Sequence, residues 1–328
     1  MFCYMSMAKK ISKPDCFLLV LTGFTCNNNC VICSVKGKEK NHPDRGFDAI
    51  AADLRQGAGE GYGSVEFTGG EPSIRRDALE LVALARELGY ETIAMSTNGR
   101  LFSYGEFCRK IIGAGLNKIT FSLLGPTDKI HDAVTRTPGT FTQIVAGIKN
   151  AQKYDHVHIN ISSVISRLNY KNLAGFGKFI VDLGVKQWYL LDLIPDGSAK
   201  AFYTRLVVRL KDLYNEFNSL ADTAERFKEF GFFDFPFCLF TPEMRNKTNA
   251  VFVNAKTRDD TNLQVGYDPK RISVDKRGKY RDAHRINIKI CARCRYYKEC
   301  GGIWKEYLDL YGEDEINKLV IKNKCLSV

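Results

Sequence analysis

The chain alternates short, continuously apolar runs with longer stretches in which apolar residues recur every three or four positions. The first pattern is typical of strands that are buried on both faces, and the second of helices that cover a sheet. Apolar runs begin near residues 16, 65, 92, 118, 156 and 187. Helical stretches are expected at 47–59, 76–88, 104–114, 141–154 and 173–183. This alternation predicts a parallel sheet with helices outside it.

The pattern changes after the sixth strand. Residues 195–198 are turn formers that close the last unit, and from Phe202 to about Phe230 the spacing is helical. The apolar stripe of that stretch is expected to pack against the sheet as core. We therefore predict a first domain at 1–198 and a mostly helical C-terminal extension at 199–328.

A tight group of three cysteines follows the first apolar run. Cys26, Cys30 and Cys33 would lie at the carboxyl end of a strand, where parallel sheets bind their ligands. Three thiolates can hold only three irons of a cubic iron–sulfur cluster, which leaves the fourth iron open to a small molecule. Zinc or a disulfide is the alternative, although structural zinc sites usually pair two Cys-x-x-Cys units.

This Cys-x-x-x-Cys-x-x-Cys loop resembles that of the radical S-adenosylmethionine (SAM) superfamily. In that superfamily the open iron of a [4Fe-4S] cluster chelates the amino and carboxylate groups of SAM. The reduced cluster cleaves SAM to a 5′-deoxyadenosyl radical, which abstracts hydrogen from a substrate. The resemblance implies a partial (β/α)6 TIM-like barrel, with Cys26, Cys30 and Cys33 as cluster ligands.

Further motifs strengthen the resemblance. The sequence Gly69-Gly70-Glu71-Pro72 follows the second strand and is similar to the family motif that accepts hydrogen bonds from the SAM ammonium. The next two strands end in small polar residues. The resemblance implies that these residues, represented by Asn98 and Ser122, face the ribose and carboxylate of SAM.

Four more residues are assigned to SAM by the same resemblance. Arg136 is expected to bind the SAM carboxylate through its guanidinium fork, and a solvated surface arginine is the alternative. Asn160 and Val164 lie on the strand that is expected to run along the adenine. Ile32 stands where the family usually has an aromatic residue, and it can cover the adenine without stacking.

A second cysteine group lies near the C-terminus. Cys291, Cys294 and Cys300 have a spacing that resembles part of the SPASM domain and its shortened Twitch form, which carry auxiliary clusters. The fourth SPASM cysteine is replaced by Trp304, so we expect one auxiliary [4Fe-4S] cluster. Cys238 is the expected fourth ligand, with Cys325 as its rival. A structural zinc is the alternative for the site, and a hydrogen-donor role is the alternative for Cys238.

The composition indicates which partners and which cell compartment to expect. The chain carries 48 Lys and Arg against 37 Asp and Glu, a net charge of +11, but the basic residues are scattered, so nucleic acid is not the expected partner. No apolar run is long enough to span a bilayer. Eleven cysteines at thiolate-ligand spacings favour a reducing cytoplasm.

The expected function is radical modification of a substrate, with a peptide or protein favoured because an extension beside an open barrel suits a large partner. The alternative substrate is a small molecule or nucleotide-derived metabolite. A reducing partner such as ferredoxin or flavodoxin is implied. An iron–sulfur electron-transfer protein that never cleaves SAM is the alternative from another class, and a nucleic-acid-binding zinc protein is a third.

Overall fold

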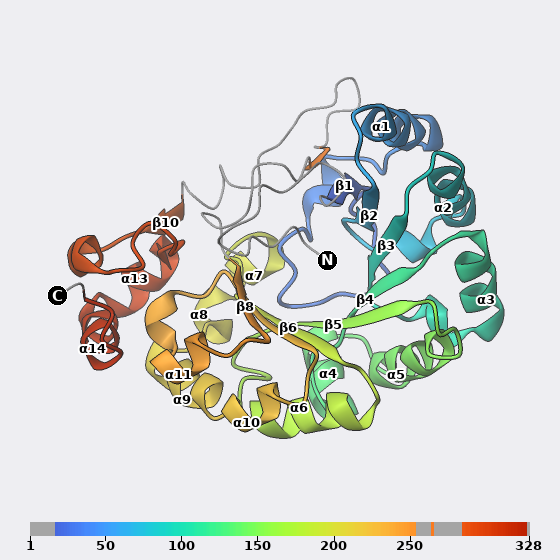
Figure 1. The fold of residues 1–328 in the computed structure, drawn as a ribbon. Helices are drawn as coiled ribbons and strands as arrows, with labels where there is room; N and C mark the ends of the chain where they lie inside the picture. Colours follow the sequence, from blue (N-terminus) through green and yellow to red (C-terminus); the bar gives the residue numbers. More distant parts are fainter. Residues whose placement is uncertain (1–16, 254–263, 266–283, 327–328) are drawn as a thin grey trace.

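The computed structural model describes residues 17–253, 264–265 and 284–326. A curled parallel sheet forms the body of the protein, with strand order β8-β7-β6-β5-β4-β3-β2-β1-β9 (Figure 1). This is the predicted partial barrel, although two strands more than expected continue the sheet beyond β6. The strands are β1 (Phe17–Leu21), β2 (Ser64–Thr68), β3 (Thr92–Thr97), β4 (Lys118–Ser122), β5 (His158–Val164), β6 (Gln187–Leu191), β7 (Glu229–Phe233), β8 (Ala250–Val253) and β9 (Gln264–Val265). Cys16, where the first run was expected to begin, lies outside the described residues.

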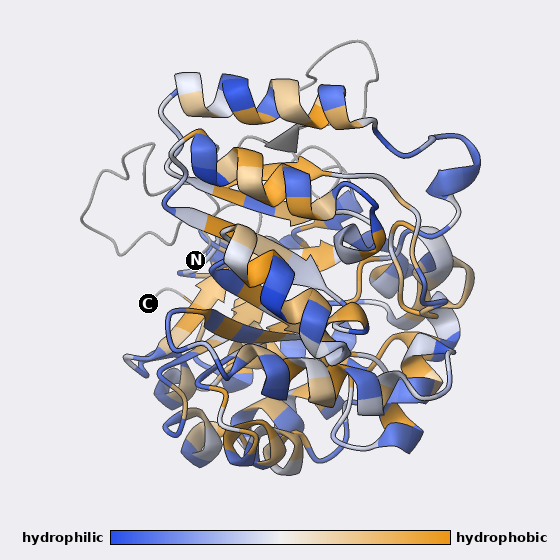
Figure 2. Cartoon of the chain, turned by 90° about the vertical axis from the view of Figure 1, so that its right-hand side faces the viewer, coloured by the Kyte–Doolittle hydropathy of each residue, from blue (hydrophilic) through white to orange (hydrophobic). Residues whose placement is uncertain are grey.

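Helices cover the outer face of this sheet (Figure 1). They are α1 (Phe47–Gly59), α2 (Ala78–Glu87), α3 (Gly105–Ala114), α4 (Asp128–Thr135), α5 (Thr140–Ala151) and α6 (Leu173–Asp182). Five of the six coincide with the predicted stretches within a few residues. The short helix α4 was not predicted; it begins at a Thr127 cap whose hydroxyl accepts a hydrogen bond from the Ile130 amide at 3.4 Å. Figure 2 shows hydrophilic and hydrophobic residues mixed along the outer helices.

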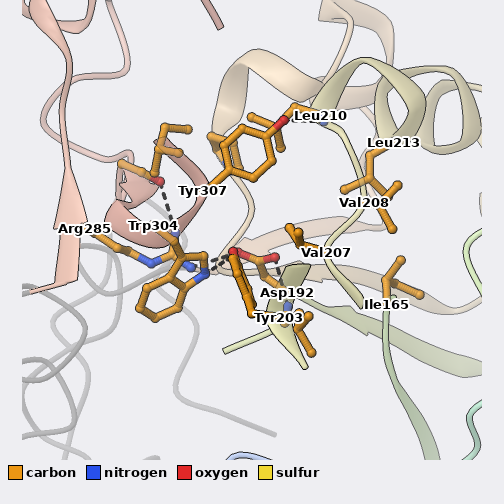
Figure 3. A pocket seen from close by; sticks show the side chains of 14 residues that line it. Ile165, Asp192, Tyr203, Val207, Val208, Leu210, Leu213, Arg285, Trp304 and Tyr307 are labelled. Atoms are coloured by element: carbon orange, nitrogen blue, oxygen red, sulfur yellow. Dashed lines mark hydrogen bonds and ion pairs between the residues drawn. The ribbon is translucent and has the colours of Figure 1, made fainter. Parts of the chain in front are cut away.

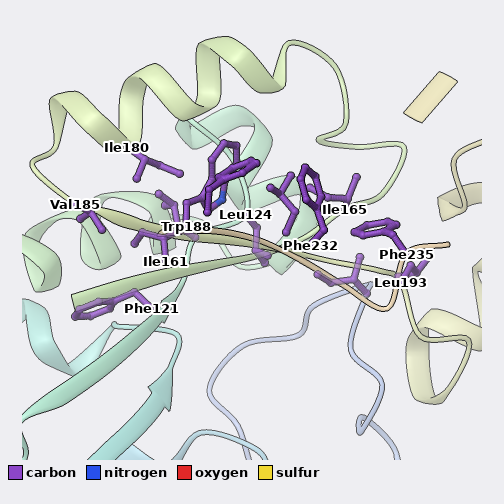
Figure 4. Packing of buried hydrophobic residues seen from close by; sticks show 14 of the residues in the cluster. Phe121, Leu124, Ile161, Ile165, Ile180, Val185, Trp188, Leu193, Phe232 and Phe235 are labelled. Carbon is purple, nitrogen blue, oxygen red and sulfur yellow. The ribbon is translucent and has the colours of Figure 1, made fainter. Parts of the chain in front are cut away.

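The main core lies between the sheet and these helices. Alternate residues of each strand point outward into it, among them Phe121, Ile161 and Trp188, which are fully buried (Figure 4). The indole nitrogen of Trp188 donates a hydrogen bond to the Ser163 hydroxyl at 3.0 Å, so its one polar atom has a partner. The sheet is therefore held to its helices by close apolar packing.

The inner face of the sheet carries the other set of alternating residues and is more polar. Ser122 and Ser162 lie opposite each other in the register, as do Thr120 and Asn160. Two small apolar clusters flank this polar centre, one of Phe17, Leu19 and Ala94, and the other of Tyr189, Phe233 and Val253. Polar groups on the inside of a barrel are available to a bound molecule.

The segment after β6 differs from the prediction of one helical stretch to Phe230. It contains α7 (Gly197–Ala201), α8 (Tyr203–Leu206), α9 (Leu210–Asn218) and α10 (Ala221–Ala224), and then β7 begins at Glu229. β7 pairs with β6 and β8 pairs with β7, so the sheet continues past the expected domain boundary at residue 198. β7 reads Glu-Phe-Gly-Phe-Phe, and its aromatic residues, buried on both faces, conceal the two-residue period of a strand.

The C-terminal part is mostly helical and lies beyond the β8 side of the sheet (Figure 1). It contains two short antiparallel strands, β10 (Arg285–Ile286) and β11 (Ile303–Trp304), with a 3-10 helix at Lys289–Arg293 between them in the chain. Two helices follow, α13 (Lys305–Tyr311) and α14 (Asp314–Lys322). Helix α14 packs against α9 and against a 3-10 helix at Phe237–Leu239, preceding α11 (Pro242–Arg245). Among the described residues, no helix has the length and apolar character needed to cross a bilayer.

Candidate functional site

The loop of Cys26, Cys30 and Cys33 follows β1 at the carboxyl edge of the sheet, and all three side chains are half-buried. Burial and, to a smaller extent, the nearby Cys26 and Cys33 thiols raise the pKa of the Cys30 thiol to about 12. The three thiols are therefore near neighbours. Such a set must lose its protons to bind iron, so loading the site would release protons.

Two glycines bring the next loop directly against this one. The amide of Gly70 donates to the Gly23 carbonyl at 2.8 Å, and the amide of Glu71 donates to the Thr25 carbonyl at 2.9 Å. A Cβ on Gly69 would lie 2.4 Å from the Gly23 oxygen, and one on Gly70 would lie 2.2 Å from the Thr25 oxygen. Only glycine permits this approach, so the Gly-Gly pair fixes Glu71 and Pro72 beside the cysteine loop.

The Glu71 carboxylate is buried, and both of its oxygens accept hydrogen bonds. Oε1 accepts from the Ser73 amide (3.1 Å), the Ser73 hydroxyl (2.6 Å) and the Thr97 hydroxyl (2.7 Å), while Oε2 accepts from the Asn98 amide (2.6 Å). Burial raises the pKa of Glu71, and these hydrogen bonds oppose that shift. The carboxylate is therefore held in one orientation by the loops that follow β2 and β3.

The side chain of Asn98 reaches the cysteine loop. Its Nδ2 donates to Asn27 Oδ1 at 2.7 Å and lies 3.8 Å from the Cys26 sulfur. The sequence-predicted residues after β1, β2 and β3 thus meet at one edge of three adjacent strands.

Helix α4 supports the other side of the loop. The amide of Asn29 donates to the Thr135 carbonyl at 3.2 Å, and the amide of Val31 donates to the Val134 carbonyl at 3.0 Å, which satisfies carbonyls at the end of the helix. Arg136 follows in a left-handed conformation with φ 52°. Its guanidinium is exposed and lies 5.7 Å from the centre of the Phe202 ring.

The turn after β6 holds the Cys33 end of the loop. The amide of Ala199 donates to the Cys33 carbonyl at 3.3 Å, and Lys38 forms an ion pair with Asp196 at 2.7 Å. Gly197 has φ +55°, and a Cβ there would lie 2.6 Å from the Cys33 oxygen. The turn at 195–198 is thus part of the wall of this site.

The remaining predicted SAM residues lie farther along the sheet. Ser122 ends β4 on the inner face, and Asn160 lies on the inner face of β5, 2% exposed, with an Oδ1 atom that has no hydrogen-bond partner. Val164 ends β5 and is half-buried. Ile32 is buried within the large apolar cluster that runs through the protein.

The C-terminal cysteines converge with Cys238. Cys238, Cys291, Cys294 and Cys300 line one pocket with Asn287 and Tyr297. Cys238 comes from the 3-10 helix at Phe237–Leu239 and is buried, whereas the other three are half-buried. In the described part of the chain, no three His, Cys, Asp or Glu side chains surround a single point as ligands of one metal ion.

Cys325, the other candidate for the fourth ligand, is fully buried. It is a neighbour of Cys294, and this proximity holds the pKa of the Cys294 thiol below its usual value. Arg245 Nη1 also donates to the Cys325 sulfur at 3.6 Å. Cys325 is thus a neighbour of the four-cysteine set and is not among the residues that line the pocket.

A second pocket adjoins the first and was not predicted (Figure 3). Asp192, directly after β6, accepts from Arg285 at 3.0 Å and from the Trp304 indole at 2.8 Å. The Arg285 guanidinium also lies 4.0 Å from the centre of the Trp304 ring. Aliphatic side chains such as Ile165, with Tyr307, form the rest of the wall. The two pockets share Pro236, Gly302 and Ile303.

Residues 20–180 match the family described as the radical SAM superfamily. This segment of the chain is a radical SAM domain. Among its curated relatives is a protein named "Probable GTP 3',8-cyclase" of Saccharolobus solfataricus, 30% identical over 194 residues, or 59% of this chain and 62% of the relative. One of the same name from Sulfolobus acidocaldarius is 30% identical and matches over 59% of this chain and 60% of its own length. The match to this radical SAM chain therefore spans about three fifths of these relatives.

Solved structures share the fold of this radical SAM protein over most of its length. Streptococcus suis SuiB bound to precursor peptide SuiA superposes with a TM-score of 0.61 at 16% identity, covering 90% of this chain and 72% of SuiB. Native anSMEcpe with bound AdoMet gives a TM-score of 0.61 at 15% identity and covers 94% of this chain and 99% of its own. At these identities the likeness is one of fold.

Proposed function

We propose that this chain is a radical SAM enzyme in which Cys26, Cys30 and Cys33 hold a [4Fe-4S] cluster. The observation that carries the proposal is the meeting of the cysteine loop, the Gly69-Gly70 turn and Asn98 at the carboxyl edge of three adjacent strands. Soft thiolate ligands suit iron–sulfur clusters, and three of them leave one iron open. An electron carrier has no need of the buried, oriented carboxylate that lies beside this loop.

The protein's own residues would then bind and orient SAM. Glu71 is assigned to the SAM ammonium through its fixed carboxylate, and Arg136, whose guanidinium is exposed, is assigned to the SAM carboxylate. Ser122, Asn160, Val164 and Ile32 are assigned to its ribose and adenine. When bound, the reduced cluster supplies the electron that splits SAM and yields the 5′-deoxyadenosyl radical. The barrel positions the substrate C–H bond and excludes water.

We assign an auxiliary [4Fe-4S] cluster to Cys238, Cys291, Cys294 and Cys300. The support is that all four line one pocket, whereas Cys325 is not among the residues that line it. Four thiolates fill all outer positions of a cube, so this cluster would serve electron transfer. Four thiolates also suit zinc, and the ratio of iron to zinc decides between them.

A peptide or protein is the proposed substrate. The pocket of Asp192 lies between the end of β6 and the C-terminal part, next to the second cysteine set. Among the described residues that line it, Arg285 is the one cation, and it is paired with Asp192 and donates to backbone carbonyls. Aliphatic walls with a neutralised charge pair suit an uncharged peptide group better than a triphosphate. The peptide-bound SuiB structure has the same fold.

A nucleotide-derived small molecule is the second candidate, since the curated relatives are named as GTP 3',8-cyclases. Incubation of the reduced protein with SAM and GTP, followed by mass spectrometry of the nucleotide fraction, tests this candidate. A new product from GTP would replace the peptide proposal.

The deciding experiment is anaerobic reconstitution, with iron and sulfide counted per chain, followed by addition of SAM and dithionite and an assay for 5′-deoxyadenosine. About eight irons with deoxyadenosine formed is the expected result. About four irons with deoxyadenosine would reassign the second site to zinc or to no metal. Iron without deoxyadenosine would favour an electron-transfer protein, and zinc without iron a zinc protein. In cells, ferredoxin or flavodoxin is the proposed electron donor.

A Cys30→Ala variant separates the two proposed clusters. It should lose about four irons and all SAM cleavage while it keeps the second site. Retention of full iron and of cleavage would contradict the ligand assignment.

A further inference from the structure

Arg100 reaches the cysteine loop from the segment after β3. Its Nη1 donates to the Asn27 carbonyl and to Asn28 Oδ1, the latter at 3.1 Å. Its Nε donates to Gln143 Oε1 on α5 at 2.7 Å. One guanidinium therefore connects the backbone between Cys26 and Cys30 to a helix of the outer layer.

The residue that Arg100 holds also contacts a thiol. The Asn28 amide points at the Cys26 sulfur at 3.4 Å, and Asn28 is 5% exposed. Hydrogen bonds to cluster sulfurs help to set the reduction potential of an iron–sulfur centre. Arg100 thus fixes the position of the Asn28 amide, which would donate a hydrogen bond to a sulfur that ligates the cluster.

The charge of Arg100 is not cancelled by an ion pair within the described residues. All the acceptors given above are neutral oxygens, and none of the ion pairs between described residues includes Arg100. Reduction makes a thiolate-bound cluster more negative. A nearby positive charge favours the more negative state, and it acts strongly where water is partly excluded.

We propose that Arg100 is a positioning residue for the SAM-binding cluster, which fixes the loop between Cys26 and Cys30 and raises the reduction potential of the cluster. This inference rests on the proposed function of that loop. The two effects are separable, since the fork of the guanidinium sets the loop and its charge sets the potential.

The test compares Arg100→Gln and Arg100→Lys in the reconstituted full chain. The measured quantities are the midpoint potential of the electron paramagnetic resonance signal that SAM perturbs, the rate of iron loss to a chelator, and deoxyadenosine formation. Arg100→Gln should shift the potential to a more negative value and slow deoxyadenosine formation by about 10- to 100-fold. Arg100→Lys should keep the potential near that of the parent but lose iron faster.

Two further variants sharpen the result. Gln143→Glu places a carboxylate against Arg100 Nε, cancels its charge and keeps the hydrogen bond, so the potential should fall even if Arg100→Gln does not fold. Arg86→Gln is the matched control, because Arg86 donates to the Gly113 carbonyl at 2.9 Å on the surface. It should match the parent in all three measurements.

If Arg100→Gln has the same midpoint potential as the parent protein, the electrostatic role of Arg100 is overturned. Where Arg100→Gln does not fold, the same result in Gln143→Glu overturns it. Parent iron retention in Arg100→Lys would overturn the positioning role. Failure of the proposed function is distinguishable, because the parent chain itself would then show no SAM-perturbed signal.

Discussion

The indole nitrogen of Trp304 donates a 2.8 Å hydrogen bond to Asp192, which joins the C-terminal part to the end of β6. Arg285 shares the same carboxylate oxygen at 3.0 Å. Burial raises the pKa of Asp192 to about 6, although Arg285 acts in the opposite direction. The charge of this junction therefore changes near neutral pH.

The Trp304 indole should report that titration. Its ¹⁵N–¹H resonance, assigned with Trp304→Phe, is expected to shift with a midpoint near pH 6, and Asp192→Asn should abolish the shift. The titratable or charged groups near Asp192 are Arg285, Asp234 and Tyr203. Arg285 lowers the pKa of Asp192 and Asp234 raises it. A flat signal between pH 5 and pH 7 would contradict the assignment.

The raised pKa of Asp192 also makes the free energy of unfolding depend on pH. Because the folded pKa of Asp192 is about 6, above the usual value of about 3.9, the folded state binds this proton more tightly. The contribution favours folding below about pH 4 and is lost as pH rises through 6. Relative to the parent, Asp192→Asn should lose less stability between pH 4 and pH 7, as measured by urea unfolding. An equal slope in both proteins would contradict the raised pKa.

Gly70→Ala should damage the SAM site. The added Cβ would lie 2.2 Å from the Thr25 carbonyl oxygen, a backbone atom that cannot move without displacing the cysteine loop. We expect the free energy of unfolding to fall by about 1–3 kcal/mol and SAM cleavage to be lost. Gly59→Ala at the end of α1 is the control, since a Cβ there meets nothing within 4 Å. Equal stability and activity in both variants would refute the close approach.

Glu71→Gln tests the fixed carboxylate. The amide group would place a donor where Ser73, Thr97 or Asn98 also donates. The free energy of unfolding should fall by about 1–3 kcal/mol, and SAM affinity should weaken at least tenfold in equilibrium dialysis. The exposed Glu87→Gln on α2 serves as the control. If Glu71→Gln binds SAM as tightly as the parent protein, the assignment of Glu71 to the SAM site is wrong.

Cys238→Ala and Cys325→Ala distinguish the two candidates for the fourth auxiliary ligand. Both side chains are buried, so their packing effects are comparable. Cys238→Ala should lose about four irons or expose one iron of the auxiliary cluster to added ligands, whereas Cys325→Ala should keep a fully ligated cube. The opposite pattern in iron content and resonance spectra would make Cys325 the ligand.

The sequence predicted the elements whose signals are local. The first six strands and five outer helices have clear apolar periods, and the cysteine and glycine motifs occupy short, continuous segments. β7 was missed because its aromatic residues are buried on both faces and do not alternate visibly. Arg100 and Arg285 were missed because each acts on partners dozens of residues away, and no periodicity marks such contacts.

The close approach of Gly197 to Cys33 has a consequence for how the chain can be divided. A fragment that stops at residue 198 would lack the Ala199 amide, which hydrogen-bonds the Cys33 carbonyl, and would bare the β6 edge that now pairs with β7. Unpaired edges of this kind recruit other chains. Such a fragment, produced on its own, is therefore expected to self-associate.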